Sequence, residues 1–212
     1  PDVMEQSGCV MREVGTTNRT HLKDYKAAVG PASGAIIHVH TSNYRIRGFS
    51  GMPGIAELCE MRDKHFPELP VIDDLGSGAL VRFSSLGLSD EPLVKDSVAA
   101  GADLVCFSGD KLIGGAQAGI ILGKEALIEK VRKNPYARMF RNCKMTYSVL
   151  ERTLAHFIND EYTQKIPFYR MASRPCAELQ KDAESLAARV GPAEGFELSV
   201  GDDISYVGSG SI

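Results

Sequence analysis

The chain has 212 residues, of which 43% are hydrophobic and 24% charged, and this composition is that of a globular protein, neither fibrous nor disordered. Its net charge of −3 excludes a strong general attraction to phosphate backbones, so no DNA partner is expected and RNA binding would depend on another region. The longest apolar runs, such as residues 35–39 and 118–122, are far shorter than the ~20 residues that span a bilayer, so no membrane segment is expected.

The cysteines are odd in number, widely spaced and without a C-x-x-C pair; they are Cys9, Cys59, Cys106, Cys143 and Cys176. This pattern argues against a disulfide scaffold and a zinc site, so we expect a reducing, cytoplasmic setting and no metal. The chain begins with Pro1 and no secretory signal follows, which leads us to expect an internal fragment of a longer protein.

Short apolar runs alternate with longer amphipathic stretches, which predicts an α/β fold with a mostly parallel sheet and right-handed crossovers. The predicted strands are residues 10–14, 35–40, 70–73, 103–107 and 118–122. The predicted helices are residues 21–29 with Thr20 as cap, 54–65, 93–100, 124–133 and 145–160. We expect residues 1–166 to form a large domain, and residues 167–212, with a helix at 178–190 and a strand at 196–200, to begin a smaller α+β domain.

A glycine-rich segment carrying Lys111 directly follows the predicted strand 103–107. Lys111 is therefore expected at a carboxyl end of the sheet, where open α/β sheets place their ligands. A lysine among apolar residues and glycines can act as an amine nucleophile, and the Ser-x-x-Lys spacing brings the Ser108 hydroxyl within reach of a cofactor phosphate. Taken alone, the segment fits equally well a solvated loop lysine before a turn, and Ser-x-x-Lys also occurs in serine acyl-transfer enzymes.

A second segment, residues 70–78, ends an apolar strand in Asp73 and Asp74 before a glycine turn. Such a carboxylate can balance the protonated ring nitrogen of pyridoxal phosphate (PLP), and the spacing from Asp74 to Lys111 is that of one strand-to-strand unit. Because side chains alternate along a strand, only one of the two aspartates can face such a ring, and we predict Asp74. The alternatives are a metal-binding or simply hydrated strand end.

Polar side chains also follow the predicted strand 35–40, in the order His40, Thr41, Ser42, Asn43. His40 and Asn43 are candidates for binding the same cofactor, since they too stand where a strand ends. A polar, solvated loop is the alternative for each of them.

Five motifs in order resemble the bacterial selenocysteine synthase (L-seryl-tRNA(Sec) selenium transferase) family: REVGTTNRT (12–20), VHTSNYRI (39–46), DLGSGA (74–79), AAGADLV (99–105) and SGDKLIGG (108–115). The resemblance extends to VGSGSI at 207–212, with Ala116 standing where proline is expected in many relatives. It implies the large domain of a fold-type-I PLP-dependent transferase, with helices on both faces of the sheet and PLP held as a Schiff base on Lys111. It also implies that Asp110 belongs to the active site.

The resemblance further assigns Arg138 and Arg141 to the selenium donor, selenophosphate, because paired guanidiniums suit a phosphate-like anion. Without the resemblance, these arginines would more often be a solvated basic segment. The implied reaction converts seryl-tRNA(Sec) to selenocysteinyl-tRNA(Sec) through an aminoacrylyl intermediate, in a homo-oligomer that forms a ring of dimers. Two alternatives stay open: a PLP-dependent α,β-elimination lyase for a small amino acid or amino-sugar phosphate, and a non-catalytic relative.

Overall fold

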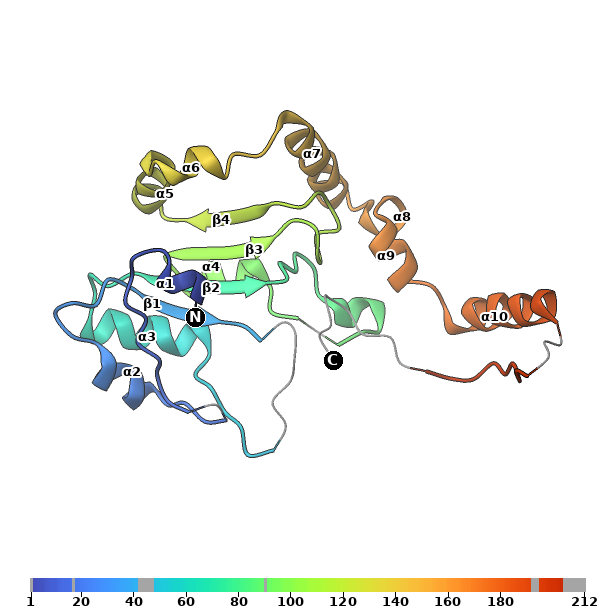
Figure 1. The fold of residues 1–212 in the computed structure, drawn as a ribbon, viewed down its shortest axis with the longest axis horizontal. Helices are drawn as coiled ribbons and strands as arrows, with labels where there is room; N and C mark the ends of the chain where they lie inside the picture. Colours follow the sequence, from blue (N-terminus) through green and yellow to red (C-terminus); the bar gives the residue numbers. More distant parts are fainter. Residues whose placement is uncertain (1, 17, 42–47, 90, 192–194, 204–212) are drawn as a thin grey trace.

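The computed structural model describes the chain except for residues 1, 17, 42–47, 90, 192–194 and 204–212 (Figure 1). The elements follow in the order α1 (Asp2–Glu5), α2 (Leu22–Ala28), β1 (Ile36–Val39), α3 (Ile55–His65), β2 (Val71–Gly76), η1 (Phe83–Leu86), α4 (Val94–Ala99), β3 (Leu104–Ser108), β4 (Gly119–Gly123), α5 (Glu125–Lys133), α6 (Tyr136–Met139), α7 (Lys144–Ile158), α8 (Tyr162–Lys165), α9 (Pro167–Ala172) and α10 (Cys176–Val190). Among the described residues, none of these helices combines the length and apolar character that crossing a membrane requires.

The sheet has the order β1-β2-β3-β4, with β1, β2 and β3 parallel and β4 antiparallel to β3. The predicted α/β class is therefore confirmed, and parallel pairing dominates. The direction of β4 follows from its connection: residues 109–118 are a short loop, whereas a parallel return needs a crossover of a dozen or more residues.

Two predicted strands are wrong. Residues 10–14 have no regular secondary structure, and Val10 is 98% exposed, so this apolar run has no sheet neighbour to pack against. In the second of these, residues 196–200, Phe196 forms only an isolated bridge and residues 197–200 are irregular, with Leu198 and Val200 exposed. Apolar β-formers make a strand only where a neighbouring strand supplies hydrogen bonds, and none of the described strands pairs with either segment.

The predicted cap of α2 is also wrong by one residue. His21, not Thr20, is the N-cap, and the Asp24 carboxylate accepts a hydrogen bond from the His21 backbone N–H at 2.8 Å. Thr20 is instead buried, and its hydroxyl donates to the Thr16 carbonyl.

The main core lies between the sheet and helices α3 and α4. Leu58, Cys59 and Met61 of α3 pack with alternate residues of the strands, among them Val71 and Val105. This alternation decides which side chains of each strand are enclosed and which face the opposite side of the sheet.

A second cluster, which we call the aromatic cluster, joins Phe83 of η1, Leu112 of the β3–β4 loop, and Ile166 and Tyr169 from the α8–α9 region. Tyr169 is fully buried and its ring stacks on Phe83 with the centroids 5.8 Å apart. By contrast, helix α10, which is described throughout, extends away from the sheet and has no buried residue (Figure 1). We therefore propose that the domain division lies after α9, not at residue 166.

Candidate active site at the carboxyl edge of the sheet

The carboxyl ends of β1, β2 and β3 meet at one edge of the sheet because these strands are parallel. His40 follows β1 there, and its backbone N–H donates to the Asp74 carbonyl at 2.9 Å. The loop after β3 is joined to the turn after β2, since the Leu112 N–H donates to the Ser77 carbonyl at 3.1 Å. The structure thus brings the Lys111 segment and the Asp74 segment together, as predicted from their positions after strands.

Asp73 and Asp74 have different surroundings because they point to opposite faces of β2. Asp73 is fully buried on the face covered by α3, and its Oδ1 lies 2.7 Å from His38 Nδ1. Asp74 is half-buried on the other face, in register with Val39 and Cys106. Asp74 is thus the more accessible of the two, whereas Asp73 has an oxygen, Oδ2, without a hydrogen-bond partner among the described residues, and the choice of Asp74 stays a prediction.

The Lys111 loop, residues 109–118, is a closed hairpin. Gly109 N–H donates to the Ala118 carbonyl and Gly115 N–H to the Gly109 carbonyl, both at 2.9 Å. Leu112 and Ile113, which follow Lys111, are fully buried and anchor the loop. Lys111 itself is half-buried and forms no ion pair with any described carboxylate, so its amine is available to a ligand.

Residues far along the chain support this loop from outside. The Tyr169 hydroxyl donates to the Leu112 carbonyl at 2.7 Å, and burial raises the pKa of Tyr169. Leu150 of α7 packs so closely that a Cβ on Gly109 would lie 2.9 Å from its Cδ2. Sequence reasoning missed these supports. A buried tyrosine does need an acceptor, but nothing local says that the acceptor is the residue after Lys111.

The glycine turn after β2 allows a close approach to β3. Gly78 has φ of +74°, and a Cβ there would lie 2.7 Å from Cδ2 of Phe107. Only glycine accepts both the left-handed backbone and this contact. The turn therefore holds the carboxyl end of β2 against the strand that leads to Lys111.

Cys106 lies beside Asp74 on the adjacent strand. Burial raises the pKa of its thiol, and the negative charges of Asp74 and Asp73 raise it further. Sequence reasoning considered Cys106 only in the cysteine pattern, because its position opposite Asp74 depends on strand register.

The other predicted site residues have varied positions. The His40 ring is held by Glu91, with Nε2 3.1 Å from Oε2. Ser108 ends β3 and is half-buried, and its hydroxyl has no hydrogen-bond partner among the described residues. Asp110 is exposed next to Lys111. Asn43 lies outside the described residues.

Arg138 and Arg141 are both exposed. Helix α6, which carries Arg138, follows α5 near the carboxyl end of β4, whereas the Lys111 loop lies at the opposite end of that strand (Figure 1).

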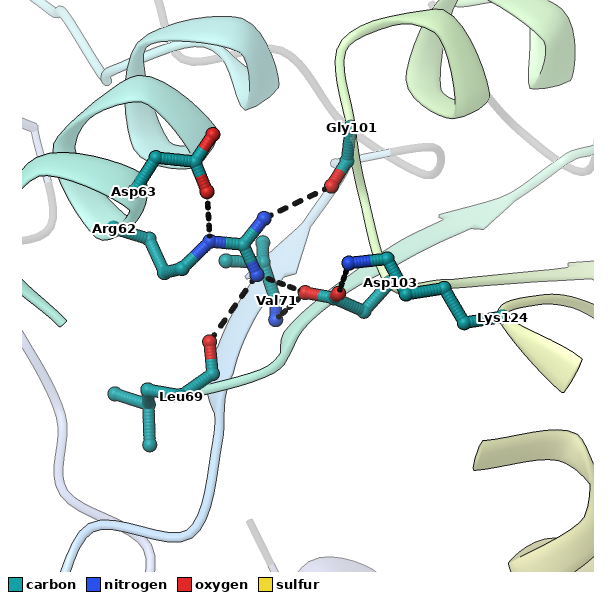
Figure 2. A network of polar contacts seen from close by, with 7 residues as sticks. All are labelled: Arg62, Asp63, Leu69, Val71, Gly101, Asp103 and Lys124. Carbon is teal, nitrogen blue, oxygen red and sulfur yellow. Dashed lines mark hydrogen bonds and ion pairs between the residues drawn. The ribbon is translucent and has the colours of Figure 1, made fainter. Parts of the chain in front are cut away.

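A separate polar network holds the amino edge of the sheet (Figure 2). Arg62 of α3 is buried, pairs with Asp103 and donates to the Gly101 carbonyl at 3.1 Å. Asp103 also accepts from the Val71 N–H at 2.7 Å and pairs with Lys124 at 2.6 Å. Burial by itself would raise the pKa of Asp103, but hydrogen bonds from Lys124, Val71 and Arg62 together lower it. This network is structural, since it lies at the edge opposite to Lys111.

Comparison with solved structures defines the class of fold. The chain is similar to D-glucosaminate-6-phosphate ammonia-lyase, with a TM-score of 0.66, 22% identity, and coverage of 88% of this chain and 44% of that one. It is also similar to apo CalE6, a methionine gamma lyase from Micromonospora echinospora, with a TM-score of 0.51, 16% identity, and coverage of 73% and 38%. The fold is that of the fold-type-I PLP-dependent enzymes, and a lysine loop and a carboxylate share its strand-end edge.

Within this class, the family model for L-seryl-tRNA selenium transferase matches residues 1–212. The chain belongs to this family. It is 46% identical to the L-seryl-tRNA(Sec) selenium transferases of Salmonella paratyphi A and Desulfovibrio desulfuricans over all of its length, covering 46% and 45% of theirs. The chain thus spans about half the length of the curated relatives it matches.

Proposed function

We propose that the full-length protein converts seryl-tRNA(Sec) to selenocysteinyl-tRNA(Sec), with PLP as cofactor and selenophosphate as selenium donor. The proposal rests on family membership, and the observation that carries it is the rigid Lys111 loop tied to the turn after Asp74. When bound, PLP supplies an electron sink for the negative charge that develops at the α-carbon of serine.

The residues at the carboxyl edge fit this cofactor. The Lys111 amine, unpaired and on an anchored loop, would hold it and then move the α-proton. The Asp74 carboxylate would hold the positive charge on the ring nitrogen, while Ser108, His40 and Asn43 are candidates for its phosphate and ring oxygens. Asp110 is proposed as a further active-site carboxylate, since it is exposed directly beside Lys111.

The overall exchange replaces the serine hydroxyl, which leaves as water, with a selenol at the β-carbon. The Se–P bond of the donor is hydrolysed by water, and its phosphate leaves as inorganic phosphate. Arg138 and Arg141 would bind the phosphate of the selenium donor. Since α6 lies away from the Lys111 loop, we propose that these arginines serve the site of a neighbouring copy in a homo-oligomer, for which the family resemblance implies a ring of dimers.

The decisive experiment measures selenium transfer to seryl-tRNA(Sec) by the full-length protein and its Lys111→Ala variant, with Lys95→Ala on α4 as an exposed-lysine control. We expect Lys111→Ala to lower the rate by about 10³-fold or more, because holding the cofactor and moving the proton both depend on this amine. The control should retain its rate. Undiminished transfer by Lys111→Ala would overturn the assignment.

Assays of the same full-length protein also test the two alternative functions, a lyase and a non-catalytic relative. A lyase would eliminate from a small amino acid or amino-sugar phosphate and leave seryl-tRNA(Sec) unchanged. A non-catalytic relative would show no absorbance band of bound PLP. The similarity to the ammonia-lyase, at 22% identity, establishes the shared fold and does not favour the lyase reaction.

A further inference from the structure

A groove lies along α7 beside the Lys111 loop, and we call it the α7 groove. It has a volume of about 320 Å³, and its lining includes Met145, Val149 and Arg152 from one face of α7, and Lys165 and Ile166 from the end of α8. The volume is near the lower end of the range typical of ligand sites, roughly 300–1,000 Å³. None of the residues assigned above to the cofactor or the selenium donor lines it.

The ionisable side chains that line the α7 groove are all of basic residue types. Arg152, His156 and Lys165 line it, and of these only His156 has a carboxylate partner among the described residues, Glu161 at 3.0 Å. Arg152 and Lys165 are both exposed and form no ion pair with a described residue. In a chain with a net charge of −3, two unpaired cations at one cavity favour an anionic ligand there.

The α7 groove adjoins the active-site loop. Gly114 forms part of its lining, and the Gly114 N–H donates to the Lys111 carbonyl at 3.0 Å. A Cβ on Gly114 would lie 2.7 Å from Cγ2 of Ile166, so loop and groove wall are in direct contact. A ligand in this groove would lie next to the segment that positions Lys111.

We propose that the α7 groove binds a nucleotide of the substrate RNA, with its phosphate on Arg152 and Lys165 and its sugar against Met145, Val149 and Ile166. The inference rests on the proposed function, in which the substrate is an aminoacyl-tRNA. A single-stranded nucleotide joins an anionic phosphate to a less polar sugar and base, which matches basic groups beside an apolar wall. The position of the α7 groove beside the Lys111 loop suits a nucleotide near the aminoacylated end of the tRNA.

The test uses the full-length protein and compares Arg152→Gln, Lys165→Gln and the double variant, with Lys95→Gln as a control that does not line the groove. One phosphate contact to single-stranded RNA contributes about 0.7 to the slope of log K against log salt. The loss of one cation from the groove should therefore weaken tRNA binding about fourfold near 0.15 M salt. We expect KM for seryl-tRNA(Sec) to rise by that factor in each single variant, with kcat and PLP absorbance unchanged. The slope of log K against log salt should fall by about 0.7 per variant.

Three outcomes would overturn the proposal. The first is that the two single variants and the double variant all bind tRNA with wild-type affinity and salt slope. The second is that KM for selenophosphate rises and KM for tRNA does not, which would assign the groove to the small donor. The third is a fall in affinity equal to that of Lys95→Gln. Failure of the proposed function is distinguishable, because the wild type itself would then transfer no selenium, whatever the groove variants do.

Discussion

Asp73 and Asp74 show how one position along a strand changes the chemistry available to a side chain. Asp73 is enclosed with His38, and its Oδ2 has no hydrogen-bond partner among the described residues. Asp74 lies on the more accessible face beside Cys106. Strand alternation predicts that the two differ, whereas only the packing of α3 shows which of them is enclosed.

Replacement of each aspartate by asparagine should separate their roles. Asp74→Asn should weaken PLP binding by about 10- to 150-fold, because a hydrogen bond between charged groups contributes about 1.5–3 kcal/mol. Asp73→Asn should leave PLP affinity within about twofold and act on thermal stability alone. Titration of the apo full-length protein with PLP measures both, and an equal loss in the two variants would contradict the assignment.

At the scale of elements, the turn after β2 and the Lys111 loop are held by close contacts that leave room only for glycine. Gly78 and Gly87 have nearly the same φ, +74° and +75°, but only Gly78 faces a neighbour, Phe107. They are a matched pair that separates backbone strain from steric clash.

We expect Gly87→Ala to lower the free energy of unfolding by about 1–2 kcal/mol, the cost of a left-handed backbone. Gly78→Ala should cost about 1–3 kcal/mol more, because Phe107 must move. Denaturant unfolding of both variants gives the comparison. Equal losses would show that the turn after β2 is free to shift.

The hydrogen bond from Tyr169 to Leu112 connects α9 to the Lys111 loop. Tyr169→Phe removes the donor and leaves a buried carbonyl unpaired, so the free energy of unfolding should fall by about 1–3 kcal/mol. Tyr162→Phe is the matched control, since the Tyr162 ring contacts Phe157 and Tyr169 in the same cluster and its hydroxyl has no partner among the described residues. If both variants unfold alike, the bond contributes nothing to holding the loop.

For the whole molecule, the network of Arg62, Asp103 and Lys124 connects α3, the start of β3 and the start of α5 (Figure 2). The pKa of Asp103 in the folded protein is below its usual value of 3.8. The folded state therefore binds fewer protons than the unfolded state near this pH. Stability from this group is complete above pH 3.8 and is lost as the pH falls through the lowered pKa.

Asp103→Asn should accordingly be less stable than the wild type at pH 7, and the difference should shrink as the pH falls below 3.8. Asp96→Asn is the control, because Asp96 and Arg82 form a half-exposed pair of the kind that contributes little. Unfolding curves between neutral and acid pH test this. A difference that does not depend on pH would contradict the role of the Asp103 charge.

The sequence by itself determined the α/β order, the four strands of the sheet, most helices, and Lys111 and Asp74 as candidates for one site. These features depend on local signals: apolar periodicity, turn residues, and polar groups placed directly after strands. The motif resemblance, also read from the sequence, indicated the family that the comparisons confirmed.

Only the tertiary structure decided the features that depend on partners distant in the chain. Residues 10–14 and 197–200 have strand-like composition but no neighbouring strand among those described, and β4 runs antiparallel because its connecting loop is short. The structure likewise enclosed Asp73, placed Tyr169 under the Lys111 loop and left α6 at the other end of the sheet. Packing and hydrogen bonding between remote segments set these outcomes, and no local pattern encodes which segments will meet.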